Sequence, residues 1–222
     1  MRLDEPPSFA ILSVNVGRPA PLGTWQGEAV TSAIRKLPVM DANIAVSATN
    51  LGGDAQADLS VHGGPDKALY AYPALHADWW EARGVAYRPG FMGENLTLDG
   101  PAEDQVHIGD VFAWGPEVMV QVSEPRGPCF KLGLLTGQAD APQQMVLSGH
   151  CGWYMRVLGP GTAPVQGSLT FVSREAGSPS VRETFLAKAH RKLVPEARVR
   201  AIMATPTLGR EWRATLERAL RS

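Results

Sequence analysis

The first 173 residues contain many short apolar-rich segments, and the one over 27–34 alternates with the period near two that is typical of a half-buried β-strand. Most of these segments end beside Gly, Pro or Asp, which are turn-forming residues. The pattern predicts strands over residues 9–16, 27–34, 42–47, 95–98, 110–114, 118–123 and 168–173. Many short strands favour a closed or partly closed barrel. We therefore expect a mainly β protein with some helix, of the α+β class.

Helical spacing of apolar residues interrupts this body twice and then replaces it. Residues 73–83 and 130–135 have the apolar spacing of short helices. After residue 177 the pattern becomes helical throughout: Ser180 is a suitable helix cap, Pro195 can begin a second helix, and residues 207–221 form a third amphipathic segment. The sequence thus predicts two parts, a β-rich domain over residues 1–173 and a small three-helix domain over 178–222.

Composition and charge narrow the class of protein. Hydrophobic residues make up 44% and charged residues 19%, as in a globular chain. Residues 1–173 carry 10 basic and 17 acidic side chains, whereas 174–222 carry 11 and 5. The basic tail is better explained by a solvated helical surface than by nucleic-acid binding. No apolar stretch reaches the roughly 18 residues of a membrane span, and no apolar signal core follows Met1. These patterns predict a cytoplasmic protein with no membrane or nucleic-acid partner.

Two cysteines offer the most reactive side chains. Cys129 follows two prolines and lies near Arg126 and Lys131, whose charges would favour a thiolate able to bind a metal or attack an electrophile. The alternative is a small buried side chain without a chemical role. Cys151 lies in an aromatic, turn-rich stretch and is more typical of a packed structural thiol. Neither cysteine has a neighbour at zinc-finger spacing.

A second candidate site follows from the glycines after His62. Gly63 and Gly64 leave backbone N–H groups free for an anion and let the chain approach a ligand closely. The alternative is an ordinary glycine turn beside a hydrogen-bonded histidine. Glu94 and Asn95 follow a further glycine, at a turn into a strand, and are equally open to either interpretation.

Seven short motifs occur in one order along the chain, at residues 36–39 (KLPV), 52–58 (GGDAQAD), 62–68 (HGGPDKA), 93–96 (GENL), 108–110 (IGD), 125–129 (PRGPC) and 152–154 (GWY). Together they resemble the MOSC domain family, named for the C-terminal domain of molybdenum cofactor sulfurases, over residues 14 to 172. Within that family the chain resembles the stand-alone bacterial YiiM-like branch, which is associated with resistance to 6-N-hydroxylaminopurine. The helical tail resembles the three-helix appendage of that branch more weakly.

The resemblance implies a β-barrel that holds a mononuclear molybdenum–pterin cofactor, with Cys129 as the ligand of the metal. The residues it implies for the cofactor pocket are Lys36, Asp54, His62, Gly63, Gly64, Glu94, Asn95, Arg126 and Cys129. Residue type suits these roles, because arginine, lysine and free N–H groups bind an anionic pterin phosphate. His62 and Asp54 are candidates for moving protons during catalysis.

The function that the resemblance implies is reduction of N-hydroxylated bases and hydroxylamines. The chain has no flavin or nicotinamide fingerprint, so the electrons would come from a separate reductase. An alternative is a sulfur-carrier or cofactor-delivery protein that uses Cys129 as a persulfide or ligand without turnover. A third is an interaction module that acts through its basic helices. The sequence leaves the natural substrate and the oligomeric state open.

Overall fold

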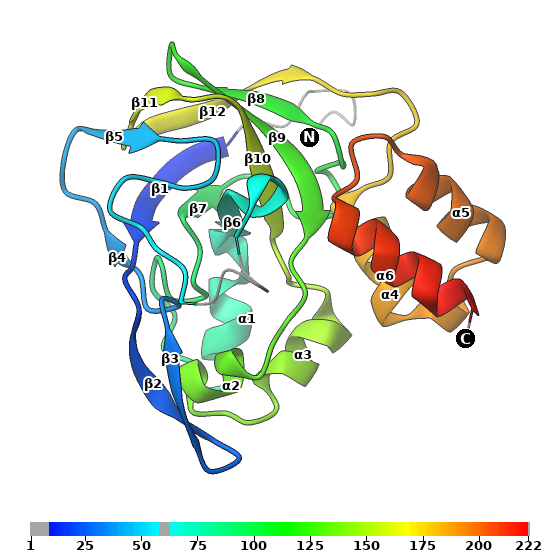
Figure 1. Ribbon diagram of the computed structural model, residues 1–222, viewed down its shortest axis with the longest axis horizontal. Helices are drawn as coiled ribbons and strands as arrows, with labels where there is room; N and C mark the ends of the chain where they lie inside the picture. Colours follow the sequence, from blue (N-terminus) through cyan, green and yellow to red (C-terminus); the bar gives the residue numbers. More distant parts are fainter. Residues whose placement is uncertain (1–8, 58–62, 222) are drawn as a thin grey trace.

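Seven strands close into a barrel in the computed structural model, which describes residues 9–57 and 63–221 (Figure 1). The strands are β1 (Phe9–Val16), β6 (Leu69–Pro73), β7 (Leu96–Asp99), β8 (Val111–Trp114), β9 (Val118–Pro125), β10 (Trp153–Gly159) and β12 (Gly167–Ser173). They pair in the order β12-β8-β9-β10-β6-β7-β1, and β1 pairs again with β12 to close the ring. All pairs are antiparallel except β6 with β7. The predicted barrel with some helix is confirmed.

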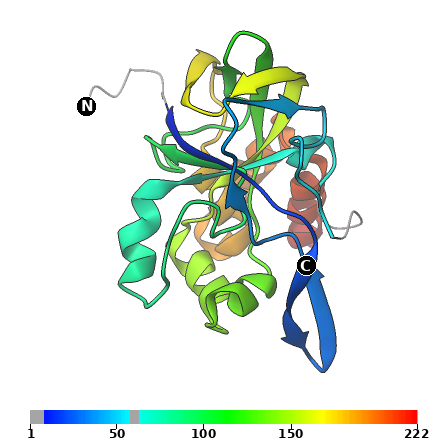
Figure 2. The same cartoon turned by 90° about the vertical axis from the view of Figure 1, so that its left-hand side faces the viewer.

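The remaining strands extend the barrel at its margins. β4 (Leu37–Pro38) adds to β1, and β5 (Asn43–Val46) pairs with β11 (Gly161–Pro164). β2 (Ala20–Trp25) and β3 (Glu28–Ser32) form a hairpin that projects from the body (Figure 2). The alternating pattern predicted one strand here, over 27–34. Positive φ angles at Gln26 (51°) and Gly27 (86°) instead reverse the chain, so that the preceding segment pairs with it.

Burial explains why β6 was not predicted. All five of its residues are buried, so its sequence does not alternate between polar and apolar positions. It lies in the middle of the sheet, where it pairs with β10 on one side and β7 on the other. β6 is therefore recognisable as a strand only once its pairing partners in the closed barrel are known.

Short helices cover one end of the barrel (Figure 1). They are η2 (Ala74–His76), α1 (Ala77–Glu81), α2 (Lys131–Thr136) and α3 (Ala141–Ser148), whereas the single turn η1 (Pro65–Lys67) contacts β9 and β10. The helices predicted over 73–83 and 130–135 correspond to η2 with α1 and to α2, whereas α3 was not predicted. Within the barrel the ring of Phe9 lies 5.3 Å from that of Phe112 and 5.6 Å from that of Trp153, centroid to centroid.

Three helices follow the barrel and pack beside it as an appendage (Figure 1). They are α4 (Val181–Ala189), α5 (Glu196–Ala204) and α6 (Arg210–Arg221), with the short η3 (Arg191–Leu193) between the first two. Ser180 caps α4 as predicted, because its hydroxyl accepts from Glu183 N at 3.0 Å, while Ser180 N donates to Glu183 Oε2 at 3.2 Å. The buried residues of α4 to α6 belong to the same apolar cluster as the barrel core. The division at residues 173–178 into two domains stays a prediction.

In the ranges that the structure describes, no helix is both long enough and apolar enough to cross a membrane.

Two stacked histidines pack where α1 meets the 149–152 turn. The His76 and His150 rings lie 3.9 Å apart, and His76 Nε2 bonds Glu103 Oε2 at 2.9 Å. Burial, together with the neighbouring His76, lowers the pKa of His150 to about 4. His150 is therefore neutral in the folded protein at the pH where it would begin to protonate in the unfolded chain.

Acidification should destabilise this packing. The unfolded chain protonates His150 below about pH 6.5, but the folded protein does so only near pH 4, so the free energy of unfolding should fall as pH drops between these values. We expect this residue to contribute about 1–2 kcal/mol of that fall, because the ring is partly exposed to screening solvent. Urea unfolding at pH 7 and pH 4.5 should show a weaker pH dependence for His150→Phe than for the wild type; equal dependence would contradict the assignment.

Candidate functional site

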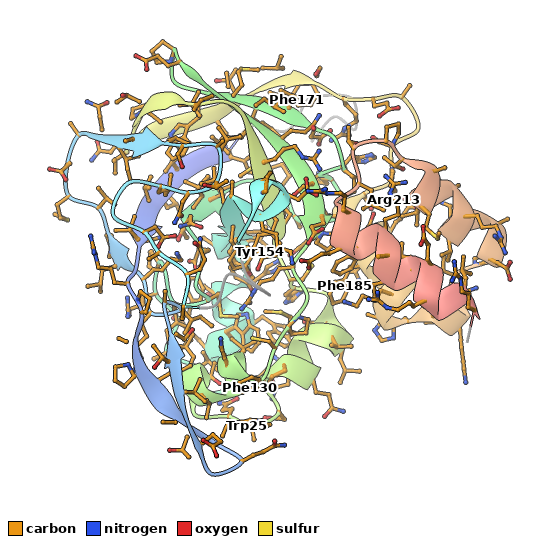
Figure 3. All side chains as sticks on the ribbon, viewed as in Figure 1. Trp25, Phe130, Tyr154, Phe171, Phe185 and Arg213 are labelled. Atoms are coloured by element: carbon orange, nitrogen blue, oxygen red, sulfur yellow. The ribbon has the colours of Figure 1, made fainter. Side chains whose placement is uncertain are left out.

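A pocket opens at one side of the barrel, where several segments distant in sequence meet. Its volume is about 720 Å³, including the open solvent at its mouth. The walls come from residues 32–36, the 54–57 segment, β6, β10 and the 126–131 segment. Tyr154 of β10 forms part of the wall and lies near the centre of the view in Figure 3.

A buried ion pair forms one wall of the pocket. Lys36 Nζ lies 2.5 Å from Asp54 Oδ1 and 2.6 Å from Oδ2, and the two side chains are 8% and 1% exposed. Asp54 also accepts from Gly17 N at 2.7 Å and from Asn95 Nδ2 at 2.9 Å. Burial lowers the pKa of Lys36, and the adjacent Asp54 partly offsets that effect. The Asp54 carboxylate therefore ties the end of β1 to the residue that precedes β7.

Asn95 and Glu94 differ in where they point. Asn95 lines the pocket, and its side-chain oxygen accepts from Tyr70 N at 3.1 Å. Glu94 is fully buried behind the wall and is not a lining residue. Its carboxylate accepts from Gly90 N at 2.8 Å, Met92 N at 2.9 Å and Thr97 Oγ1 at 2.7 Å. Glu94 thus holds the turn that places Gly93 in the pocket wall, and burial raises its pKa to about 6.

Cys129 and Arg126 face the same pocket from the segment after β9. Cys129 is a free, partly buried thiol two residues before α2. Arg126 is only 6% exposed, and its guanidinium carbon lies 4.8 Å from the centroid of the Tyr70 ring. Burial opposes the charged form, but the Tyr70 and Tyr154 hydroxyls and the Cys129 thiol together raise the pKa of Arg126. Arg126 therefore stays a cation at the side of the thiol.

The pocket has a strong excess of positive charge. Among the described residues, four basic side chains line it, namely Lys36, Lys67, Arg126 and Lys131, against one acidic side chain, Asp54. Among the described residues Arg126 has no carboxylate within salt-bridge distance, and the same holds for Lys131. Burying a guanidinium without a counter-charge is costly. The site is therefore suited to an anionic ligand that supplies that charge.

The remaining predicted residues are only partly brought together. Gly63 lines the pocket, whereas Gly64 lines an adjoining hollow. His62 lies outside the described residues. Cys151 is fully buried and does not line the pocket, as its packed neighbourhood predicted; burial raises the pKa of its thiol well above the ordinary value.

Residues that the sequence did not place in the site complete the walls. Lys67, Tyr70 and Tyr154 line the pocket, and so does Lys131, which was expected only to favour the Cys129 thiolate. Lys67 and Tyr70 lie in or next to the glycine motif that begins at His62, so the signal was present in the sequence. Only the fold shows that Tyr70, in the middle of a fully buried strand, supports the Arg126 guanidinium.

An aromatic stack attaches the projecting hairpin to the Cys129 segment. The Trp25 ring, at the end of β2, lies 4.9 Å from the ring of Phe130 at an interplanar angle of 26°, and both lie together at the base of the molecule (Figure 3). Stacked pairs of this kind add to the stabilisation from burial. The hairpin therefore supports the segment that carries the thiol.

With this geometry in place, comparison with known proteins identifies the family. The model of the MOSC domain matches residues 58–170, which is half of the chain. The chain belongs to the MOSC domain family. Relatives of this MOSC protein include YflK of Bacillus subtilis (strain 168), 37% identical over 210 residues that cover 93% of this chain and 92% of YflK. YiiM of Escherichia coli (strain K12) is 35% identical over 196 residues, which cover 86% and 85% of the two chains.

Solved structures support the same assignment over nearly the whole length. The crystal structure of YiiM from Geobacillus stearothermophilus matches with a TM-score of 0.78 and 35% identity, covering 96% of this chain and 99% of that one. The barrel and the helical appendage of this MOSC protein are thus a YiiM-like arrangement. A protein named reductase from Gibberella moniliformis is 38% identical over 160 residues, 70% of this chain but 28% of that protein.

The two thiols should differ sharply in reactivity. Cys129 faces the pocket, whereas Cys151 is 0% exposed, so a charged thiol reagent should label one thiol per native chain and two after denaturation. Labelling with a maleimide or an aromatic disulfide reagent, followed by peptide mass spectrometry, would measure this. Labelling of Cys151 at the rate of Cys129 in the native protein would contradict the placement.

Replacing the buried Glu94 should destabilise the pocket wall. In Glu94→Gln an amide N–H group would face donors that the carboxylate now accepts from, and we expect the free energy of unfolding to fall by about 2–3 kcal/mol. Glu196→Gln, an exposed change on α5, is the matched control. Equal urea midpoints for the two variants would show that the three hydrogen bonds at Glu94 do not hold the turn.

Proposed function

We propose that this MOSC protein binds a mononuclear molybdenum–pterin cofactor in the pocket and reduces N-hydroxylated compounds, such as hydroxylaminopurine-type bases and hydroxylamines. The single observation that carries the proposal is the free Cys129 thiol beside a buried arginine that lacks a carboxylate partner among the described residues. A soft thiolate is a suitable ligand for molybdenum, and an unneutralised guanidinium is suited to a phosphate.

The donor set fits the cofactor. Cys129 would ligate the metal, while Arg126, Lys131 and the Gly63 backbone would bind the anionic pterin tail from the pocket wall. Lys36 is already paired with Asp54 and contributes mainly the shape of the wall. When bound, the cofactor supplies a redox centre that passes two electrons to the substrate.

The stoichiometry of the reaction determines which protons and electrons must be supplied to the substrate. Reduction follows R–NHOH + 2 e⁻ + 2 H⁺ → R–NH₂ + H₂O, in which the N–O bond breaks and each fragment takes one proton. His62 and Asp54 stay predictions as proton carriers; Asp54 already accepts hydrogen bonds from Lys36, Gly17 and Asn95. The electrons would come from a separate reductase, because the sequence has no flavin or nicotinamide fingerprint. The likeness to part of a protein named reductase supports a redox role.

The ligand role of Cys129 is tested by metal content. Protein purified from a host that makes the cofactor should carry close to one molybdenum per chain, and Cys129→Ser should lose both the metal and the reduction of 6-N-hydroxylaminopurine. Cys151→Ala is the matched control and should keep both, since Cys151 lies outside the pocket. Elemental mass spectrometry and a turnover assay with a chemical reductant give the two readouts.

Absence of molybdenum from folded wild-type protein would overturn the proposal. A sulfur adduct on Cys129 in intact-mass spectra would then favour the carrier alternative, in which the thiol holds a persulfide.

A further inference from the structure

Two further hollows adjoin the cofactor pocket, both bordered by α6 of the appendage. One is lined by Gly64, Asp66, Arg210 and Glu211 among others, and the second by Pro128, Lys188 and Trp212 among others. Lys67 lines these two hollows and the cofactor pocket as well. Its side chain is therefore the point where the pocket meets the junction between barrel and appendage.

Lys67 is held between two carboxylates from different parts of the fold. Its ammonium pairs with Glu211 of α6 and lies 3.7 Å from Glu124 Oε1 of β9. The Glu211 side chain is 64% exposed, whereas that of Glu124 is only 3% exposed. A chain of acidic and basic groups thus runs from solvent, through Glu211 and Lys67, to the pocket wall.

Glu124 is an unusual residue for a salt bridge. Its Oε2 is buried and has no hydrogen-bond partner among the described residues. The backbone of Gly209 approaches this oxygen so closely that a side chain at position 209 would overlap it. A carboxyl in this environment is not held in its ionised form by a full set of donors, so it is suited to holding a proton.

The other groups on the pocket wall are less suited to supplying protons. Arginine does not lose its proton in proteins, which excludes Arg126. Lys36 is tied to Asp54 through both carboxylate oxygens, and Lys131 has no carboxylate within salt-bridge distance in the described ranges to return a proton to it. Among the described cations that line the pocket, Lys67 has Glu124 and Glu211 beside it, and these carboxyl groups can return a proton to it.

We infer that Lys67 donates protons to the substrate in the cofactor pocket and that Glu124 and Glu211, acting through it, replace those protons from solvent. The inference rests on the proposed function, which requires two protons for each N–O bond broken. The ammonium of Lys67 gives one proton to the nitrogen or oxygen fragment and then takes a new one from the Glu124 carboxyl, which regains its own from solvent in the two adjoining hollows, both of which it lines. Glu124 and Glu211 are positioning residues of this relay, since neither lines the cofactor pocket.

The electrostatic surroundings agree with this direction of transfer. Burial raises the pKa of Glu124 to about 7, with Glu211 and Asp66 adding to the rise and with Lys67 and the Trp212 backbone opposing it. For Lys67, burial acts against the charged form, but the bond to Glu211 and the charge of Glu124 leave its pKa raised. Transfer of a proton from Glu124 to a neutral Lys67 is therefore favourable, because the amine has the higher pKa. In the described part of the chain, Lys188 of α4, Arg210 and Arg218 of α6 and Tyr154 of β10 also lie around this cluster.

The test is the pH profile of turnover in Glu124→Gln. In the wild type, kcat should fall as pH rises through about 7, because the relay loses its stored proton. In Glu124→Gln that limb should disappear, with kcat lower by about tenfold or more below pH 7 and KM within twofold. Molybdenum per chain should be unchanged, since Glu124 does not line the cofactor pocket. Glu196→Gln on α5 is the matched control and should keep the wild-type profile.

A second variant keeps the test decisive if Glu124→Gln fails to fold. Glu211→Gln removes a negative charge that raises the pKa of Glu124, so the descending limb should move to lower pH. An unmoved limb in Glu211→Gln, or a wild-type profile in Glu124→Gln, would overturn the relay. The same holds if the limb persists in Glu124→Gln but disappears in His62→Asn. A wild type that holds molybdenum but reduces no N-hydroxylated compound would overturn the proposed function first, and the relay with it.

Discussion

The buried pair of Lys36 and Asp54 is the interaction on which the site depends. One carboxylate accepts from the Lys36 ammonium, from the backbone that follows β1 and from the Asn95 side chain that precedes β7. These three segments are far apart in sequence, and two of them, at Lys36 and at Asn95, line the pocket. Breaking one partner of such a buried pair leaves an uncompensated charge, which is strongly destabilising. The pair therefore fixes the shape of the pocket before any ligand binds.

With the wall fixed in this way, the remaining charged groups of the pocket also have fixed positions. Arg126 lies over the Tyr70 ring, next to the Cys129 thiol, and the described structure gives it no carboxylate. The aromatic ring stabilises the guanidinium without neutralising it. An anionic ligand gains from both features, since the cation is already desolvated and oriented. The Trp25–Phe130 stack helps to hold the segment that carries the Cys129 thiol in place.

The appendage contributes charged groups and hydrogen bonds to the barrel in addition to packing against it. Its α6 supplies Glu211 to Lys67, and its Gly209 leaves room for the Glu124 carboxyl. Its backbone also bonds the barrel, because Arg210 N donates to Asp66 Oδ2 at 3.1 Å. The helices thus complete the electrostatic surroundings of a residue that lines the pocket. This interaction is a physical reason for the barrel and the appendage to occur in one chain. The structure of YiiM from Geobacillus stearothermophilus has the same arrangement, and the match covers nearly the whole length of both chains.

The sequence by itself determined the elements whose signals are local. A short apolar run ended by Gly17 predicted β1 at its observed bounds, Ser180 as a suitable cap predicted the start of α4, and the glycine and cysteine motifs pointed to Gly63, Arg126 and Cys129. Only the tertiary structure decided that Glu94 supports the pocket from behind, that the fully buried β6 forms its wall, and that Lys67 meets Glu211, 144 residues away. The reason is physical: these roles depend on burial and on charges brought together when the barrel closes and α6 packs against it. No local pattern records which distant carboxylate a lysine will meet.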